Sequence, residues 1–281
     1  MSAAVDTTTD RLAELLTSFR LPTLVTELVP RMVAAGRADV LPLLVEILEL
    51  EAGDRRERRV DRLRRASRLP PGKTFATLDE ARLPRPLVQQ LHDLARGDFL
   101  ERAGNVLAFG LPGVGKSHAA CALGHALVEA GHAVLFAPTY QLVQELLVAK
   151  RDLDLPRALR RLDLYDLVIC DDIGYVQQNA DEIEVLFTFL AERYERRSVL
   201  ITSNLVFSEW DRIFKNPMTT AAAIDRLVHH SSILEFAVPS FRSDKARKEP
   251  PDKATAVKAN GDNYTKANGD NYTKPSKGKT K

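Results

Sequence analysis

Eight consecutive residues have the types and the spacing that bind a polyphosphate. They read GLPGVGKS from Gly110 to Ser117 and fit the pattern G-x-x-x-x-G-K-[ST] between a predicted strand and a predicted helix. Glycines let backbone N–H groups point at phosphate oxygens, the lysine reaches the β- and γ-phosphates, and the serine hydroxyl is a ligand for Mg²⁺. The residues predicted to hold ATP are Gly110, Pro112, Gly113, Val114, Gly115, Lys116, Ser117 and His118. The alternative, a glycine-rich turn without a ligand, is disfavoured by the strand-loop-helix context.

A pair of carboxylates follows another apolar segment, LVICDD, at Leu167–Asp172. Asp171 is predicted to bind Mg²⁺ through water, and Asp172 to polarise the attacking water. Taken alone, two aspartates shortly before Gly174 are more often the start of a turn. The phosphate-binding loop upstream favours the metal-anchoring interpretation.

Composition limits the classes of protein that need to be considered. The chain has 281 residues, of which 44% are hydrophobic, so it can bury one large core or a core and a small second domain. Its two cysteines, Cys121 and Cys170, lie far apart in apolar segments, which excludes a disulfide framework or a cysteine zinc site. There is no charged-then-apolar leader and no apolar stretch of membrane-spanning length. We therefore expect a cytoplasmic protein without membrane contact.

Hydrophobic periodicity divides the chain into four parts. Apolar residues at three-to-four spacing predict a helical amino-terminal domain over residues 1–70, followed by a linker with short helices over 71–104. Strands and helices then alternate over 105–243. Residues 244–281 are rich in lysine, asparagine and glycine and contain KANGDNYT twice in tandem, which predicts a disordered basic tail.

The alternating part predicts an α/β fold with a parallel sheet and flanking helices. The expected strands are NVLAF, AVLFA, LVICD, SVLIT and SILEF. A helix is expected over SHAACALGHALVEAG, with Gly131 at its carboxyl-terminal cap. Polar residues Ser203 and Asn204 end the fourth strand. Asn204 would lie near the γ-phosphate if these strands are neighbours, although a lone asparagine at a strand end is usually a turn residue.

With these motifs in this order, the chain resembles the AAA+ ATPases, and within them the IstB-like transposition helper proteins, relatives of the DnaC-type helicase loaders. The similarity covers roughly Asp10 to Arg242. It is carried by LERAGNVLAFGLPGVGKSH, LYDLVICDDIGY, LAERYERRSVLITSNLVFSEW and AAAIDRLVHHSSILEF. The resemblance implies a P-loop NTPase fold of the AAA+ type without the AAA+ lid domain. It assigns Lys116 and Ser117 to Walker A, Asp171 and Asp172 to Walker B, and Asn204 to sensor 1.

Arg226, in AIDRL, matches the arginine finger that such proteins offer to a neighbouring subunit. The resemblance thus implies self-association through Arg226 in trans. The alternative is a surface arginine paired with Asp225. Asp172 stands where many AAA+ proteins have glutamate, and its shorter reach predicts slow hydrolysis. Arg242 is a candidate to replace the sensor arginine of the missing lid.

The predicted partner surface is an arginine-rich helix in the amino-terminal domain. Such a surface neutralises phosphates without reading sequence, and the absence of interleaved aromatic residues favours duplex over single-stranded DNA. The predicted DNA-binding residues are Arg55, Arg56, Arg58, Arg59, Arg62, Arg64, Arg65 and Arg68. A solvated charged helix is the alternative. His118, His125, His229 and His230 show no metal-ligand spacing and are expected at helix surfaces or in packing.

The leading hypothesis is an oligomeric, ATP-dependent DNA-binding regulator that helps an IstA-like transposase select its target, with slow, Mg²⁺-dependent and DNA-stimulated ATP hydrolysis as the switch. Three alternatives stay open. They are a helicase loader of the DnaC type, a metabolite kinase built on the same loop, and a DNA-coating protein with an inactive ATP site.

Overall fold

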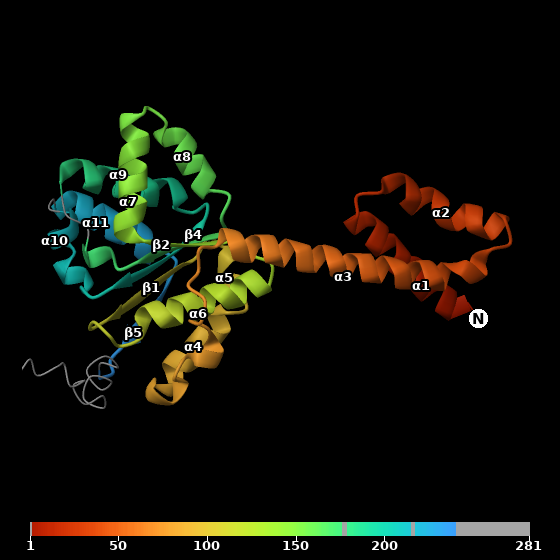
Figure 1. Ribbon diagram of the computed structural model, residues 1–281, viewed down its shortest axis with the longest axis horizontal. Helices are drawn as coiled ribbons and strands as arrows, with labels where there is room; N and C mark the ends of the chain where they lie inside the picture. Colours follow the sequence, from red (N-terminus) through yellow and green to blue (C-terminus); the bar gives the residue numbers. More distant parts are fainter. Residues whose placement is uncertain (1, 176–178, 215–216, 240–281) are drawn as a thin grey trace, which may run out of the picture.

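The computed structural model describes residues 2–175, 179–214 and 217–239. Three helices form an amino-terminal bundle: α1 (Ser2–Ser18), α2 (Pro22–Ala34) and α3 (Leu41–Ala66). Leu12 and Leu16, one turn apart on α1, are buried with Leu41 at the start of α3. The bundle stands apart from the rest of the molecule, and α3 joins the two (Figure 1).

The helix α3 is continuous over 26 residues, which at 1.5 Å per residue is about 39 Å. Its second half leaves the bundle and packs beside the sheet (Figure 1). There Val60 is buried in a hydrophobic cluster, and Leu63 packs against the same cluster. Arg64 Nη2 lies 2.7 Å from Glu129 Oε1. The apolar stripe within the arginine-rich segment therefore attaches α3 to the sheet layer.

Five parallel strands form one sheet in the order β2-β3-β4-β1-β5. Their bounds are Asn105–Gly110 (β1), Val134–Pro138 (β2), Leu167–Asp171 (β3), Ser198–Ser203 (β4) and Ser231–Phe236 (β5). In this order β1 lies between β4 and β5, with Phe109 opposite Ser203 and Gly110 opposite Phe236. The carboxyl ends of β1, β3 and β4 thus meet at one edge. The phosphate loop follows β1 at this edge, Asp172 follows β3 and Asn204 follows β4. The predicted α/β fold with a parallel sheet is confirmed.

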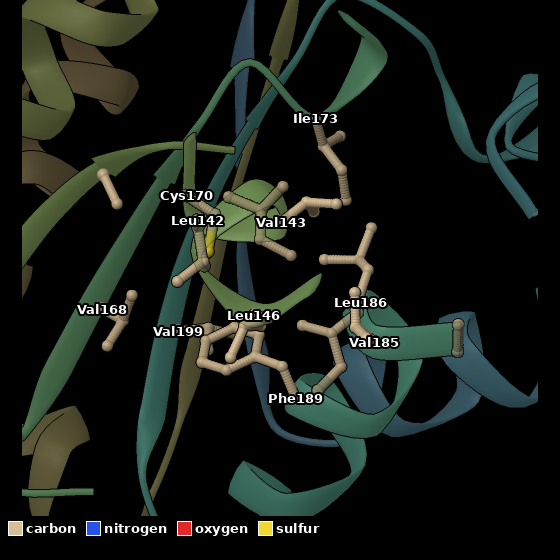
Figure 2. Close-up of a cluster of buried hydrophobic side chains, with 14 of the residues drawn as sticks. Leu142, Val143, Leu146, Val168, Cys170, Ile173, Val185, Leu186, Phe189 and Val199 are labelled. Carbon is tan, nitrogen blue, oxygen red and sulfur yellow. The ribbon is translucent and has the colours of Figure 1, made fainter. Parts of the chain in front are cut away.

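Helices cover both faces of the sheet, and side chains of each strand alternate between them. On one face, α7 (Thr139–Arg151) and α9 (Ala180–Arg193) enclose Val168 and Cys170 with Phe189 (Figure 2). On the other face, α6 (Lys116–Glu129) covers Leu167 and Ile169. The remaining helices of the first face are α8 (Leu155–Leu162), α10 (Asp211–Phe214) and α11 (Pro217–Val228).

The predicted linker consists of short elements that lie against α6. They are 3-10 helices at Phe75–Thr77 and Glu80–Arg82, then α4 (Arg85–Leu94) and α5 (Asp98–Glu101). Leu87 and Leu91, one turn apart on α4, are buried in the same cluster as Leu123 and Leu127 of α6. The helix α4 is thereby packed against the second half of α6.

Several local predictions can be compared directly with the structure. Gly131 follows the end of α6 with φ 95°, which is the left-handed cap conformation expected for it. Cys121 and Cys170 are unpaired and buried, and burial raises the pKa of each thiol to about 12. Within the described ranges, no helix is both long and apolar enough to cross a membrane. Arg242 and the predicted tail lie outside the described residues.

Candidate nucleotide-binding site

The loop between β1 and α6 has the backbone geometry of a phosphate cradle. Gly113 and Gly115 have φ of 82° and 99°, a region that side chains disfavour, and a Cβ on Gly110 would lie 2.7 Å from the carbonyl oxygen of Phe236. The helix α6 begins at Lys116, directly after this loop. Its first N–H groups and its dipole therefore face the space that the loop surrounds.

Lys116 is folded over the loop that precedes it. Its side chain is 9% exposed, and its Nζ donates to the carbonyl oxygens of Gly110 at 2.6 Å and Leu111 at 2.9 Å. The ammonium group is thus held at the mouth of the cradle, where a phosphate oxygen could replace a carbonyl as its partner.

The loop forms one wall of a cavity of about 310 Å³, within the size range of small-molecule sites. Of the predicted site residues, those that line it are Pro112, Gly113, Gly115, Lys116, Ser117, His118, Asp172 and Asn204. Four do not. Gly110 contributes the carbonyl that holds Lys116, and Val114 is buried in the core. Asp171 accepts a hydrogen bond from the Thr202 hydroxyl. Arg226 lies on α11.

Thr202 joins the two aspartates at the end of β3. Its hydroxyl donates to Asp171 Oδ1 at 2.7 Å and accepts from the backbone N–H of Asp172 at 2.8 Å. Thr202 is 1% exposed, so both bonds are shielded from water. Asp172 has φ 60°, which turns its side chain out of the strand direction and into the cavity lining. This threonine was missed in the sequence, where only Ser203 and Asn204 of the same strand end were noted.

Asn204, which follows β4, also lines the cavity, and its side-chain oxygen lies close to Gly174. Its Oδ1 is buried and has no hydrogen-bond partner among the described residues. A Cβ on Gly174 would collide with this oxygen, so a glycine is required there for Asn204 to keep its position. A buried amide oxygen without a partner is rare and marks a place where a ligand or water is expected.

The remaining wall comes from the segment that was expected to be only a linker. Lys73, Thr77, Leu78 and Asp79 line the cavity. His118 Nε2 lies 3.0 Å from Thr77 Oγ1, which ties this segment to the first turn of α6. No phosphate-binding pattern marks these residues, so sequence reasoning missed them.

Arg226 is placed near the end of α11 and packs against α9. Its guanidinium carbon lies 4.9 Å from the centre of the Phe187 ring, and its Nη1 is buried without a hydrogen-bond partner among the described residues. The alternative of an ion pair with Asp225 is not formed in the described part of the chain. The end of α11 leads into the amino-terminal end of β5, on the edge of the sheet away from the cavity.

Most of the predicted DNA-binding arginines on α3 already have partners within the chain. Those in ion pairs are Arg55, Arg58, Arg64 and Arg68. Arg59 Nη2 donates to the carbonyl oxygen of Gly131 at 3.2 Å. Arg56, Arg62 and Arg65 are exposed and make no ion pair or side-chain hydrogen bond within the described ranges. All these pairs are exposed, so each contributes at most about 1 kcal/mol.

A second basic surface lies on α8, which was not among the predicted DNA-binding segments. Arg157, Arg160 and Arg161 are exposed on this helix, and none of them has an acidic partner in the part of the chain that the structure describes. Ala158 and Leu162 anchor the opposite side of the helix in the core.

Comparisons with known proteins extend these observations. A protein-family model described as "IstB-like ATP binding protein" matches residues 15–249. An insertion-sequence ATP-binding protein of Sinorhizobium fredii is 44% identical over 240 residues, which cover 84% of this chain and 80% of the relative. The ATP-binding protein of insertion sequence IS21 in Pseudomonas aeruginosa is 38% identical, covering 72% of this chain and 76% of the relative.

Among solved structures, the chain is similar to a replication initiator DnaA bound to AMPPCP and single-stranded DNA. The TM-score is 0.52 at 15% identity, covering 65% of this chain and 56% of that one. Domain III of DnaA from Thermotoga maritima gives a TM-score of 0.50 at 18% identity, covering 65% and 75%. At such identities these likenesses establish only that the chain shares the fold of those domains.

Proposed function

Because the chain belongs to the IstB-like ATP-binding proteins of insertion sequences, we propose that it is a Mg²⁺-dependent ATPase that assembles on duplex DNA and assists a transposase in target selection. The observation that carries this proposal is the cavity in which the phosphate loop, Asp172, Thr202 and Asn204 meet, with Asp171 hydrogen-bonded to Thr202. A cytoplasmic location and an IstA-like transposase partner belong to the same proposal, since the relatives are described as insertion-sequence proteins.

The loop and Lys116 bind the phosphates of ATP. The N–H groups of the loop and of the first turn of α6 donate to phosphate oxygens, and Lys116 exchanges its two carbonyl partners for the β- and γ-phosphates. Leu78 and the other residues of the 73–79 segment lie on the remaining wall, where the nucleoside would contact them.

The donor set at the cavity fits Mg²⁺, a hard cation that prefers oxygen ligands. Ser117 would supply its hydroxyl directly, and Asp171, oriented by Thr202, would hold a water ligand. When bound, the ion neutralises charge on the β- and γ-phosphates. Asp172 and Asn204 face the cavity from the ends of neighbouring strands, and between them they orient the attacking water. The short side chain of Asp172 makes this step slow.

Self-association follows from the place of Arg226. It is remote from the cavity of its own chain, and one of its guanidinium nitrogens is buried without a partner among the described residues. In an assembly that sets this edge against a neighbour's cavity, Arg226 would stabilise the charge of the neighbour's transition state.

Duplex DNA is proposed to bind along α3. Arg56, Arg62 and Arg65 are available for phosphates without breaking any ion pair of the described chain. The ion pairs of the other arginines are weak enough for phosphates to compete with them.

Steady-state ATP turnover with and without duplex DNA, at low and moderate salt, tests the proposal. We expect DNA to stimulate turnover and salt to weaken the stimulation, because counterion release drives the binding. The Lys116→Ala variant is the control and should lose ATP-dependent assembly on DNA. Turnover that DNA leaves unchanged at both salt concentrations would refute a DNA-assembled ATPase.

A further inference from the structure

Three metal-ligating side chains meet at the edge of the sheet opposite the nucleotide cavity. Glu195 comes from the turn between α9 and β4, and His229 and His230 come from the junction of α11 and β5. One ligand atom from each of the three lies within 4.8 Å of those of the other two. Among the described residues, no other group of three histidine, cysteine or acidic side chains has this geometry.

We propose that Glu195, His229 and His230 form a binding site for a transition-metal ion of the zinc type. Two imidazole nitrogens and one carboxylate oxygen are a common ligand set for zinc, and three protein ligands leave one position of a tetrahedron for water. Nitrogen ligands disfavour Mg²⁺ and Ca²⁺, which select oxygen. This site is therefore chemically distinct from the Mg²⁺ site proposed at the nucleotide cavity.

The two segments that supply the ligands are fixed by the fold. The carbonyl oxygen of His230 accepts from Asn105 N at 2.8 Å, so His230 is held at the start of the sheet. The turn that carries Glu195 is held by Arg193, whose buried guanidinium donates to the carbonyl oxygens of Leu162 and Ser198, each at 2.9 Å. The ligands therefore project from backbone that the fold holds in place.

The immediate surroundings tolerate a cation. His229 Nδ1 lies 4.0 Å from Glu195 Oε1, and its ring centre lies 4.2 Å from that of His230. The nearby guanidinium groups of Arg196 and Arg197 are neutralised by aspartates, at 2.6 Å from Asp163 and 2.8 Å from Asp166 respectively.

Tyr194 contacts one of the proposed metal ligands. Its hydroxyl lies 3.2 Å from His229 Nδ1. This contact holds the His229 ring beside the segment that carries Glu195.

The sequence pattern places His229 and His230 only at a helix surface, because their adjacency offers no ligand spacing along one helix. The third ligand lies 34 positions earlier by residue number, and only the packing of α9 against α11 brings it near. The spacing rule therefore could not detect the site.

Metal binding here would join the α9–β4 turn to the α11–β5 junction. Arg226 is on α11 one turn before His229, and the N–H of His229 donates to Asp225 O at 3.1 Å. A bound ion would therefore fix the segment that carries Arg226. This consequence rests on the role proposed for Arg226, whereas metal binding itself does not.

Titration of the full, untagged chain with Zn²⁺ tests the site, by calorimetry in the absence of nucleotide and Mg²⁺, after treatment with a chelator. We expect one saturable site per chain. The double variant His229→Ala/His230→Ala should lose it, and Glu195→Gln should weaken it by roughly tenfold or more. His92→Ala is the matched control, because His92 is exposed and lies 2.9 Å from Glu80 without a third ligand among the described residues. It should bind Zn²⁺ as the parent does.

Thermal unfolding with and without Zn²⁺ provides the second readout. Bound metal should raise the Tm of the parent and of His92→Ala, because a ligand of the folded state stabilises it. Glu195→Gln changes one exposed carboxylate to an amide of the same shape, so it should fold normally and lose most of the rise. No saturable binding in the parent, or equal affinity in the parent and Glu195→Gln, would overturn the site. Neither readout requires ATP turnover, so failure of the metal site leaves the proposed function standing.

Discussion

The hydroxyl of Thr202 donates a 2.7 Å hydrogen bond to Asp171 Oδ1 across the boundary between β4 and β3. The Thr202 oxygen also accepts from the backbone N–H of Asp172. One buried side chain therefore positions both the carboxylate proposed as Walker B and the backbone turn that directs the Asp172 carboxylate. Any displacement of β4 relative to β3 would therefore shift the proposed metal and water positions.

Thr202→Val should therefore lower catalysis more than nucleotide binding. A hydrogen bond to a charged group is worth about 1.5–3 kcal/mol, so we expect kcat to fall roughly 10- to 100-fold, with a smaller change in the Kd for ATP. Steady-state turnover and equilibrium nucleotide binding measure the two effects. Thr202→Ser, which keeps the hydroxyl, should stay near the parent, and equal losses in both variants would contradict this role for the hydrogen bond.

Arg226→Ala should abolish stimulated turnover, because arginine fingers contribute roughly 10³-fold or more to kcat. Nucleotide binding should be retained, since Arg226 does not line the cavity of its own chain.

A mixing experiment distinguishes action in trans from a structural defect. Lys116→Ala subunits keep Arg226 but lack the Walker lysine, so mixing them with Arg226→Ala subunits should restore part of the turnover that neither shows alone. If the mixture stays as inactive as its components although the two variants co-assemble through the ATP of the Arg226→Ala subunit, the finger does not act in trans.

The unusual aspartate at position 172 yields a prediction with two opposite effects. Asp172→Glu should raise turnover by roughly tenfold, because the longer side chain brings the carboxylate closer to the water. It should also lower the free energy of unfolding by about 1 kcal/mol, since the φ of 60° suits aspartate or asparagine better than glutamate.

The matched control is Asp172→Asn, which suits the same backbone conformation but lacks the carboxylate. Its turnover should fall by roughly 100-fold with unfolding nearly unchanged. Turnover assays and denaturant unfolding provide both measurements. A decrease in turnover for Asp172→Glu would show that the carboxylate is already at its working distance.

The proposed DNA surface can be tested by removing equal charge from two helices. The triple alanine variant at Arg56, Arg62 and Arg65 should weaken duplex binding regardless of sequence. It should also reduce the slope of log K against log salt by about 0.9 for each DNA phosphate that the variant no longer neutralises.

The triple alanine variant at Arg157, Arg160 and Arg161 on α8 removes the same charge and serves as the comparison. Binding curves at several salt concentrations separate a local effect from an effect of net charge. Equal losses of affinity in both variants would indicate that net charge alone determines DNA binding. A loss only in the α8 variant would indicate that DNA binds at α8 and not at α3.

The sequence predicted those parts of the site whose structure is determined by residue types within a short segment of the chain. The glycines of the phosphate loop, the apolar strands and the cap at Gly131 belong to this group, because local backbone geometry determines which residues can stand there. The fold class follows from the same local patterns, since alternating strands and helices leave few other arrangements.

What the sequence could not supply depends on which elements become neighbours. In the sequence, Thr202 is an ordinary polar strand residue, and its role depends on the packing of β3 beside β4. Leu78 is an ordinary linker residue, and its role depends on the fold that places it in the cavity wall. Arg64 of α3 and Arg68, two residues beyond its end, pair with acids on α6 and α7, far away along the chain, so these ion pairs could not be inferred from the charge pattern of one helix.

The uninterrupted α3 gives the molecule a lever arm. Its second half is attached to α6, the helix whose first turn faces the phosphates, and its first half, about 20 Å long, carries the amino-terminal bundle beyond that attachment. A tilt of about 10° at the attachment would displace the far end of the helix by about 3 Å over that arm. If nucleotide binding at α6 tilts α3, then by reciprocity whatever holds the bundle in one orientation changes the nucleotide affinity, with the same coupling free energy in both directions.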